Sequence, residues 1–253
     1  MEKREYNLDE LKKGVFLAAR GGGVRSCVSI GVLKLLEENE IPVKGISGES
    51  LASMFAALLA TGHNADQILD LFIRYNKVIT RATPLLRGRG SIVIDDSVCK
   101  ETNNATFKDA KIDCYINASY GKLLKPQLKL FSKEETPNET FGTACRASAS
   151  LPVFFGRFNT QIDGVDYDFS DGGSLYNPYI PATDLPIIYS NFHNGIDYYR
   201  AIPMLHKTIV DAKEASDIVI DTPVGGTLVT CSEVDMIVLA EKGYQQAKMT
   251  LKL

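Results

Sequence analysis

Apolar residues along the chain alternate between short continuous runs and runs with helical spacing. Gly14 to Ala19 is a continuous apolar run, which is typical of a strand buried on both faces of a parallel sheet. Residues 27–38 have apolar side chains at helical spacing, and Val43 to Ile46 indicates a second short strand. Another helical run begins near residue 51 and stops at Gly62. This strand–helix–strand–helix order predicts a doubly wound α/β start.

The rest of the chain predicts further elements of both kinds. Strands are expected at 112–118, 127–131, 185–189 and 218–220, and helices at 64–79, 136–148 and from 232 onward. Asp163-Gly164 predicts a tight turn between two extended runs, and the second run ends at Asp171. No repeat or low-complexity segment interrupts the pattern, so we expect a single domain over residues 1–253.

Composition narrows the class of protein. A hydrophobic content of 45% and a charged content of 23% are ordinary for a globular protein, and a net charge of −3 gives no overall basic field for nucleic acid. No run is apolar enough to span a bilayer, and the start lacks the apolar core of a signal peptide. Five scattered cysteines without a Cys-x-x-Cys pair favour free thiols and a cytoplasmic protein, with at most peripheral membrane contact.

Three arginines occur in the Pro- and Gly-containing stretch from Thr80 to Ser91, namely Arg81, Arg87 and Arg89. Such a cluster can bind phospholipid phosphates. The alternative is a solvated loop, which we consider the better interpretation.

The candidate nucleophile is Ser47, in the stretch Gly45-Ile46-Ser47-Gly48-Glu49-Ser50 between the short strand and the next helix. A serine at a strand-to-helix turn presents its hydroxyl at the sheet edge, and the first helix amides favour the negative charge of an ester's transition state. The spacing resembles the nucleophile elbow Gly-x-Ser-x-Gly, with Glu49 in place of the second glycine. The alternative is a turn serine that caps a core helix.

The first strand leads into three consecutive glycines, Gly21-Gly22-Gly23. A dinucleotide-binding fingerprint would have a further glycine where Ser26 stands, and a P-loop would need Gly-Lys-Ser/Thr, which is absent. Bare backbone amides can also form an oxyanion hole, because no side chain keeps the substrate oxygen away. A tight turn without any binding role is the remaining interpretation.

Four separated blocks resemble motifs of the patatin-like phospholipases. Residues 21–25 are similar to the family's glycine-rich oxyanion loop, and residues 45–48 to its elbow. Residues 145–152 resemble the helix end beside its active site, and Asp171-Gly172-Gly173 resembles its Asp-Gly-Gly/Ala block. Order and spacing both agree, and the resemblance covers roughly residues 14–250.

The resemblance implies a three-layer α/β/α sandwich with a mostly parallel central sheet and a Ser–Asp dyad. Ser47 would take the acyl group of a lipid or other acyl ester, and Asp171 would accept its proton and later activate water. The same resemblance implies an oxyanion hole formed by Gly21, Gly22, Gly23, Arg25 and Gly48. Motif-supporting positions would be Gly45, Glu49, Gly172 and Gly173. No metal or cofactor is expected.

Two other functions remain open at this point. Glu49 places a carboxyl group close to the nucleophile and departs from the family pattern, which favours an inactive protein that binds a lipid or acyl group. We expect instead that Glu49 is paired with Arg20 or Arg25. The order Ser47, Asp171 and then His193 or His206 also fits the triad of an α/β-hydrolase.

Overall fold

The computed structural model describes residues 6–82, 90–122, 125–151, 155–172, 177–193, 203–224 and 232–253. The described α-helices are α1 (Leu8–Leu11), α2 (Cys27–Glu38), α3 (Ala52–Ala60), α4 (Ala65–Ala82), α5 (Gly90–Glu101), α6 (Phe141–Ser148), α7 (Pro203–Ala215) and α8 (Glu233–Leu251). Two short 3₁₀ helices are η1 (Gly23–Ser26) and η2 (Phe107–Asp109). The strands are β1 (Val15–Ala19), β2 (Val43–Glu49), β3 (Asp113–Lys122), β4 (Lys125–Phe131), β5 (Phe158–Ile162), β6 (Val165–Ser170), β7 (Ile187–His193) and β8 (Ile218–Pro223).

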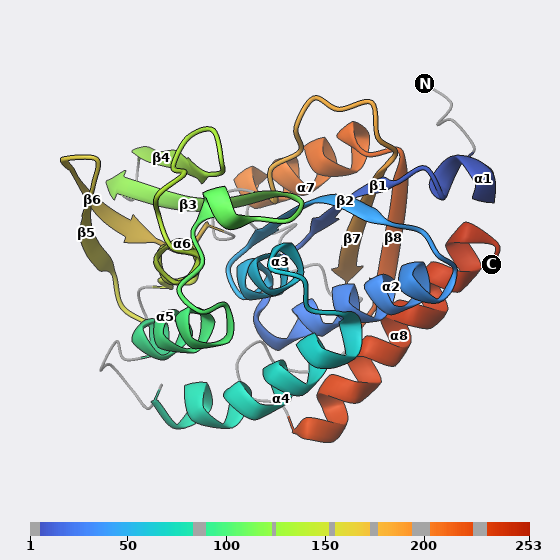
Figure 1. Ribbon diagram of the computed structural model, residues 1–253, viewed down its shortest axis with the longest axis horizontal. Coiled ribbons are helices and arrows are strands. Elements are labelled where there is room, and N and C mark those ends of the chain that lie inside the picture. Colours follow the sequence, from blue (N-terminus) through green and yellow to red (C-terminus); the bar gives the residue numbers. More distant parts are fainter. Residues whose placement is uncertain are drawn as a thin grey trace.

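These strands form one sheet in the order β5-β6-β3-β2-β1-β7-β8, with β4 paired to β3. The pairs from β3 through β2, β1 and β7 to β8 are parallel, whereas β4, β5 and β6 pair in antiparallel fashion. Figure 1 shows the antiparallel part at the end of the molecule farthest from β8. The central strands therefore follow the doubly wound parallel pattern, and the remaining strands extend one edge.

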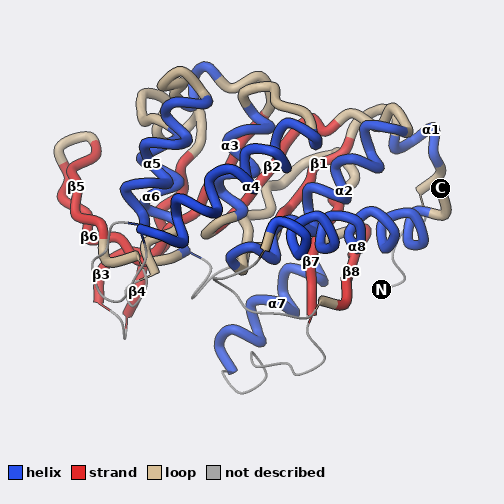
Figure 2. The backbone as a smooth tube through the Cα atoms, turned by 90° about the horizontal axis from the view of Figure 1, so that it is seen from below, coloured by secondary structure: helices blue, strands red, loops and turns tan. Residues whose placement is uncertain are grey.

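Helices cover both faces of the parallel part. The larger apolar cluster joins one sheet face to α2, α3, α4 and α8, and the smaller cluster joins Phe16, Ala18, Ile187 and Tyr189 to Ala212 of α7. Figure 2 shows α7 set apart from α2, α3 and α4 across the strands. All five residues of β1 are buried, as expected of a central strand with helices on both sides. The expected α/β/α sandwich is thus confirmed.

Helices α2 and α8 lie in direct backbone contact through two glycines. A Cβ added at Gly31 would lie 1.7 Å from the Ala240 carbonyl oxygen, and one at Gly243 would lie 2.0 Å from the Val28 carbonyl oxygen. Any side chain at either position would separate the two helices. The closing helix of the chain is in this way fixed against the first helix of the parallel unit.

Several predicted boundaries were wrong. Strand β2 continues to Glu49, although its apolar pattern predicts an end at Ile46. Helix α6 begins at Phe141 with Thr140 as its N-cap, whereas the capping pattern predicted a start near Thr136. The helical segment Gly90–Glu101 was not expected at all.

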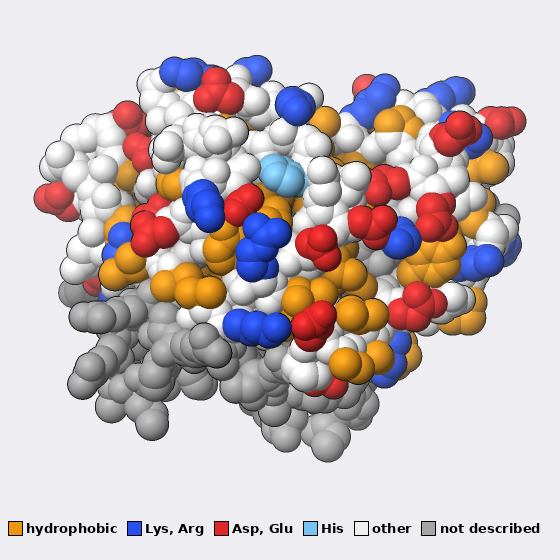
Figure 3. Space-filling model, turned by 60° about the horizontal axis from the view of Figure 1, so that its bottom comes forward, with side chains coloured by type: hydrophobic (Ala, Val, Ile, Leu, Met, Phe, Trp, Pro, Cys, Tyr) orange, Lys and Arg blue, Asp and Glu red, His pale blue; other side chains and the backbone are white. Residues whose placement is uncertain are grey.

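Other sequence predictions agree with the structure or lie outside it. Residues Cys27, Cys99, Cys114 and Cys145 are free thiols, and Cys231 is outside the described residues. Arg81 is in α4, while Arg87 and Arg89 are also outside the described part. Among the described helices, none combines the length and the apolar character needed to cross a membrane. In the view of Figure 3, basic and acidic side chains are interspersed with apolar ones.

Candidate active site

Ser50, rather than Ser47, occupies the turn between strand and helix. Strand β2 ends at Glu49, helix α3 begins at Ala52, and Ser50 has a φ of 51°. A non-glycine residue in this left-handed region is strained by about 1–3 kcal/mol, and such strain concentrates at functional sites. The Ser50 side chain is partly exposed, as a group that meets a substrate must be.

The prediction that Ser47 stands at this turn is wrong. Ser47 lies inside β2, paired with Ala18 of β1 and Tyr115 of β3, and its side chain is 0% exposed. Its hydroxyl has no hydrogen-bond partner. The motif frame is Gly48-Glu49-Ser50-Leu51-Ala52, three residues later than predicted. One signal favoured this frame, because Ser50 directly precedes the helical apolar run and Ser47 does not.

Asp171 lies at the end of β6 and contacts Ser50 directly. The Ser50 hydroxyl donates to Asp171 Oδ2 with an Oγ···Oδ2 distance of 2.6 Å. The backbone of Asp171 is held on both sides, since its N–H donates to the Ser150 carbonyl and its carbonyl accepts from the Ser119 hydroxyl. Only 5% of Asp171 is exposed. The expectation that this residue lies at a strand end is confirmed.

The C-terminal end of α6 fixes the backbone of Ser50. The Ser50 N–H donates to Ser148 Oγ at 2.8 Å, and the Ser148 hydroxyl donates to the Asn117 carbonyl of β3 at 2.7 Å. The Asp171 N–H also donates to the Ser150 carbonyl, so the segment 148–150 forms hydrogen bonds with both Ser50 and Asp171. The block at residues 145–151 therefore lies beside the site, as its resemblance implied, and Pro152 is outside the described residues.

The glycine loop passes next to Ser50. A Cβ added at Gly21 would lie 2.4 Å from the Glu49 carbonyl oxygen and 3.0 Å from Ser50 Cβ. The Gly21 N–H donates to Glu49 Oε1 at 2.9 Å, so this amide is occupied and the predicted oxyanion role of Gly21 is not supported. Gly22 is the N-cap of η1 and Gly23 its first residue. The N–H groups at such positions have no acceptor within the helix and can donate hydrogen bonds to an anion.

The other predicted motif residues have packing roles in the structure. Gly48 lies inside β2, where a Cβ would lie 2.4 Å from the Ala52 carbonyl oxygen, so this glycine permits the close turn into α3. It precedes the turn serine by two residues and does not follow it, so its predicted oxyanion role is not supported. Gly45 makes room for the Phe16 ring. Gly172 lies against the Asn117 carbonyl, and Gly173 is outside the described residues. The remaining predicted residue, Arg25, is buried within η1.

Glu49 is 2% exposed, and its side chain points away from solvent beside the glycine loop. Burial raises the pKa of Glu49 well above its usual range, and the charge of Asp171 adds to this effect, while the Gly21 N–H and Arg20 oppose it. The Arg20 guanidinium donates through Nη1 to Asn191 Oδ1 at 2.8 Å and to the Phe192 carbonyl at 2.9 Å. The partner that Glu49 hydrogen-bonds is thus the Gly21 amide, which the sequence did not indicate.

Neither histidine proposed for a triad is shown next to the pair. His193 lies at the exposed end of β7, and the side chain of His206 is outside the described residues. The serine hydroxyl contacts the aspartate without an intervening ring. Among the described residues, no group of His, Cys, Asp and Glu has the arrangement of a metal site.

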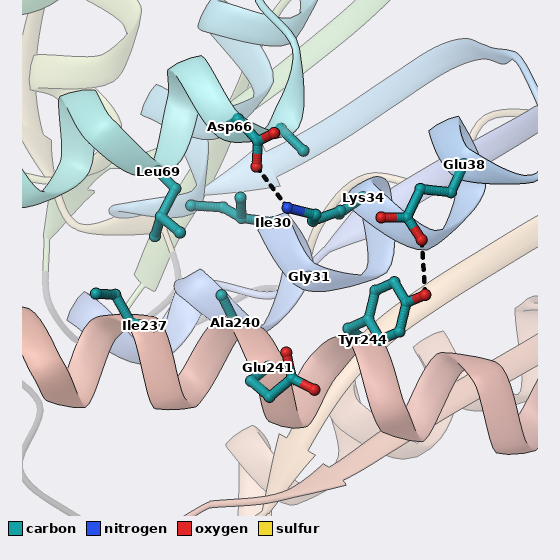
Figure 4. Close-up of a pocket in the computed structure, with 11 residues that line it drawn as sticks. Ile30, Gly31, Lys34, Glu38, Asp66, Leu69, Ile237, Ala240, Glu241 and Tyr244 are labelled. Atoms are coloured by element: carbon teal, nitrogen blue, oxygen red, sulfur yellow. Dashed lines mark hydrogen bonds and ion pairs between the residues drawn. The ribbon is translucent and has the colours of Figure 1, made fainter.

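A pocket of about 250 Å³ lies elsewhere, between α2, α4 and α8. Figure 4 shows its polar rim, where Lys34 Nζ contacts Asp66 Oδ1 at 2.7 Å and Tyr244 donates to Glu38 Oε2 at 2.6 Å. Neither Ser50 nor Asp171 lines it. The pocket therefore belongs to the helical layer and not to the serine site.

Comparison with known proteins places these features in a family. The family model for patatin-like phospholipase matches residues 17–185, which contain the glycine loop, Ser50 and Asp171. The chain belongs to the patatin-like phospholipase family.

Individual relatives cover parts of the chain. An uncharacterized protein of Acanthamoeba polyphaga mimivirus is 30% identical over an alignment of 182 residues, with 64% of this chain and 58% of that protein covered. Patatin-like phospholipase domain-containing protein 6 of Homo sapiens is 43% identical over 53 residues, which are 21% of this chain and 4% of that protein. The chain thus spans little more than half of the viral relative and a small part of the human one.

Solved structures agree on the fold. The type III effector ExoU has a TM-score of 0.56 at 17% identity, with 94% of this chain and 53% of that chain covered. VipD from Legionella pneumophila has a TM-score of 0.58 at 14% identity, with 94% of this chain and 66% of that chain covered. At these identities the likeness concerns the fold alone.

Proposed function

We propose that this member of the patatin-like phospholipase family is a serine acyl hydrolase of lipid esters, with Ser50 as nucleophile and Asp171 as base. The observation that carries the proposal is the 2.6 Å contact between Ser50 Oγ and Asp171 Oδ2 at a strained strand-to-helix turn. A serine is a weak nucleophile until an adjacent base accepts its proton, and a direct carboxylate contact provides that base. Family membership over residues 17–185 supports the same class of reaction.

In the first half of the reaction, Ser50 Oγ attacks the ester carbonyl carbon while its proton passes to Asp171. The carbonyl oxygen becomes an oxyanion, for which the amides of Gly22 and Gly23 at the start of η1 are the proposed donors. Collapse of this intermediate breaks the ester C–O bond. The departing alkoxide takes the proton from Asp171 and leaves as the alcohol, and the acyl group stays on Ser50.

In the second half, water replaces the alcohol. Asp171 accepts a proton from water as its oxygen attacks the acyl-serine carbonyl, and the same amides bind the second oxyanion. Collapse breaks the bond to Ser50 Oγ, which regains the proton from Asp171. The products are the free fatty acid and the unmodified enzyme, so the cycle is complete without a metal or a diffusible cofactor.

The inactive lipid-binding protein is a weaker alternative, because the structure changes the role of the residue that suggested it. That alternative requires Glu49 to add an unpaired negative charge near the nucleophile. Its Oε1 instead accepts from the Gly21 N–H, and burial raises its pKa well above the usual range. The feature that favoured inactivity is therefore compatible with a working oxyanion loop.

The decisive experiment compares Ser50→Ala with Ser47→Ala in labelling by a fluorophosphonate and in hydrolysis of a medium-chain fatty acyl ester. We expect Ser50→Ala to lose labelling and to lower kcat by at least a thousandfold, because the acyl acceptor is removed. Ser47→Ala is the matched control, since it removes a buried hydroxyl without a partner from the strand that precedes Ser50. Labelling of the Ser50→Ala protein at the wild-type rate would refute the proposal.

A further inference from the structure

Glu49 occupies an unusual position for a carboxyl group, directly before the proposed nucleophile and inside the protein. One of its oxygens, Oε1, accepts the Gly21 N–H, and the other, Oε2, is buried with no hydrogen-bond partner. A carboxylate has lone pairs for about four hydrogen bonds. A single donor would leave an ionised Glu49 far from satisfied, and burying such a charge is costly.

The groups around Glu49 do not supply what an anion needs. Arg20, at the end of β1, attracts it electrostatically, but its Nη1 donates to Asn191 and Phe192 of β7, and its guanidinium lies over the Phe192 ring at 4.8 Å. On the side of β6 lies Asp171, whose charge repels a second anion. An ionised Asp171 and an ionised Glu49 are therefore in competition, as for other close carboxyl pairs.

The neighbour on β3 also gives no hydrogen bond to an anionic Glu49. Asn117 is paired with Glu49 in the sheet, and residues paired in this way project to the same face. Asn117 is 0% exposed, and both its Oδ1 and its Nδ2 lack a hydrogen-bond partner. The Asn117 amide therefore donates no hydrogen bond to Glu49 Oε2, and the Gly21 N–H is the donor that the described residues give to this carboxyl group.

We propose that Glu49 is a positioning residue for the acyl transfer and acts as a neutral carboxylic acid that holds the Gly21 amide. This inference rests on the function proposed above. The contact ties the first residue of the glycine loop to the residue before Ser50, so Gly22 and Gly23 keep a fixed position relative to the nucleophile. Because the acid is uncharged, it does this without opposing the negative charge of the oxyanion.

The kinetic test compares Glu49→Gln with Glu49→Ala, with Glu135→Gln on an exposed loop as the matched control. Glutamine keeps a carbonyl oxygen for the Gly21 N–H and cannot ionise, whereas alanine removes the acceptor. We expect Glu49→Ala to lower kcat by about thirtyfold or more with less than a threefold change in KM. The kcat of Glu49→Gln should be at least tenfold higher than that of Glu49→Ala. Glu135→Gln should have the kcat and KM of the wild type.

The pH profile separates positioning from a merely structural role. As pH rises, ionisation of Glu49 places a negative charge beside Ser50, so wild-type kcat should fall in the alkaline range. The ratio of wild-type kcat to Glu49→Gln kcat should therefore decrease from pH 6 to pH 9. Arg20 and Asp171 are present in both proteins, so this ratio isolates Glu49.

An infrared difference spectrum of wild type minus Glu49→Gln tests the protonation state without any activity. At pH 7 it should contain the carbonyl band of a protonated carboxylic acid. A carboxylate band in its place, equal losses in the glutamine and alanine variants, or full activity of Glu49→Ala would each overturn the inference. Loss of the proposed function has a different signature, namely a wild-type protein without Ser50-dependent hydrolysis whose infrared band is still that of an acid.

Discussion

Ser50 combines three features that the neighbouring residues do not share: a positive φ, a partly exposed side chain and a direct contact to a buried aspartate. The strained backbone is stabilised locally, because the Ser50 N–H donates to Ser148 and its carbonyl accepts from Ser53. The strain positions the hydroxyl outside the strand ladder. Ser47, three residues earlier and inside β2, has none of these features.

The role of Asp171 can be tested by Asp171→Asn. Asparagine retains an oxygen that accepts the Ser50 hydroxyl but cannot take up its proton, so we expect kcat to fall by about 10²–10⁴-fold. The matched control is Asp166→Asn in β6, the strand that precedes Asp171, where the exposed carboxylate accepts from Gln161. Steady-state hydrolysis with circular dichroism as a check on folding measures the effect. An Asp171→Asn enzyme within tenfold of wild type would exclude Asp171 as the base.

At the scale of elements, the site depends on where β2, α3, α6 and η1 end or begin. Glycines permit the closest of these approaches, such as Gly48 against the first residue of α3 and Gly172 against β3. Glycines also allow α2 and α8 to pack closely, since Gly31 and Gly243 each face a carbonyl oxygen of the opposite helix. Since η1 continues into α2, the position of α2 also fixes the proposed oxyanion donors.

The packing of α8 on α2 can be tested by Gly243→Ala. Alanine favours a helix by about 1 kcal/mol over glycine. Its Cβ would, however, lie 2.0 Å from the Val28 carbonyl oxygen, and backbone on both sides cannot move cheaply. We expect the free energy of unfolding to fall by about 1–3 kcal/mol.

Urea unfolding monitored by circular dichroism measures this change. Lys242→Ala, one residue away on the exposed side of α8, is the control and should shift the midpoint little. A Gly243→Ala protein that is as stable as wild type would show that the two helices are not in the contact described.

For the whole molecule, acids whose pKa is raised in the folded state make stability depend on pH. The pKa of Glu49 is raised well above the usual value of 4.5, chiefly by burial, and the pKa values of Glu37 and Glu139 are raised in the same direction. The native state therefore keeps protons that the unfolded chain has lost above that value. The free energy of unfolding therefore falls as pH rises from the unfolded-state pKa of 4.5 toward the raised pKa of the native state, because the unfolded state binds fewer protons there than the native state.

We predict that Glu49→Gln is stabilised relative to wild type increasingly as pH rises from 5 to 8. Glutamine removes the titration and preserves the shape, so the difference in melting temperature isolates Glu49 from the other raised acids. Each kcal/mol corresponds to about 2–4 °C in a protein of this size. We expect the difference to grow by at least about 2 °C between the two pH values, with Glu135→Gln unchanged, in differential scanning fluorimetry. A constant difference would show that Glu49 titrates alike in both states.

The sequence by itself determined the features that depend on local periodicity and on order along the chain. Continuous apolar runs identified β1, helical spacing identified α2 and α3, and Asp163-Gly164 identified the β5–β6 turn, because these patterns reflect burial on one or two faces. The family was also recognisable from the order of its motif blocks, and Asp171 was correctly expected at a strand end.

Only the tertiary structure decided which serine and which amides face each other. Ser47 and Ser50 have similar local sequences, and the end of β2 depends on pairing with β3, where Glu49 lies opposite Asn117. The partner of Glu49 is an amide 28 residues earlier in the chain, and the partner of Ser50 is a carboxylate 121 residues later. Contacts of this range arise from sheet register and helix packing, which the spacing of residues in one segment does not specify.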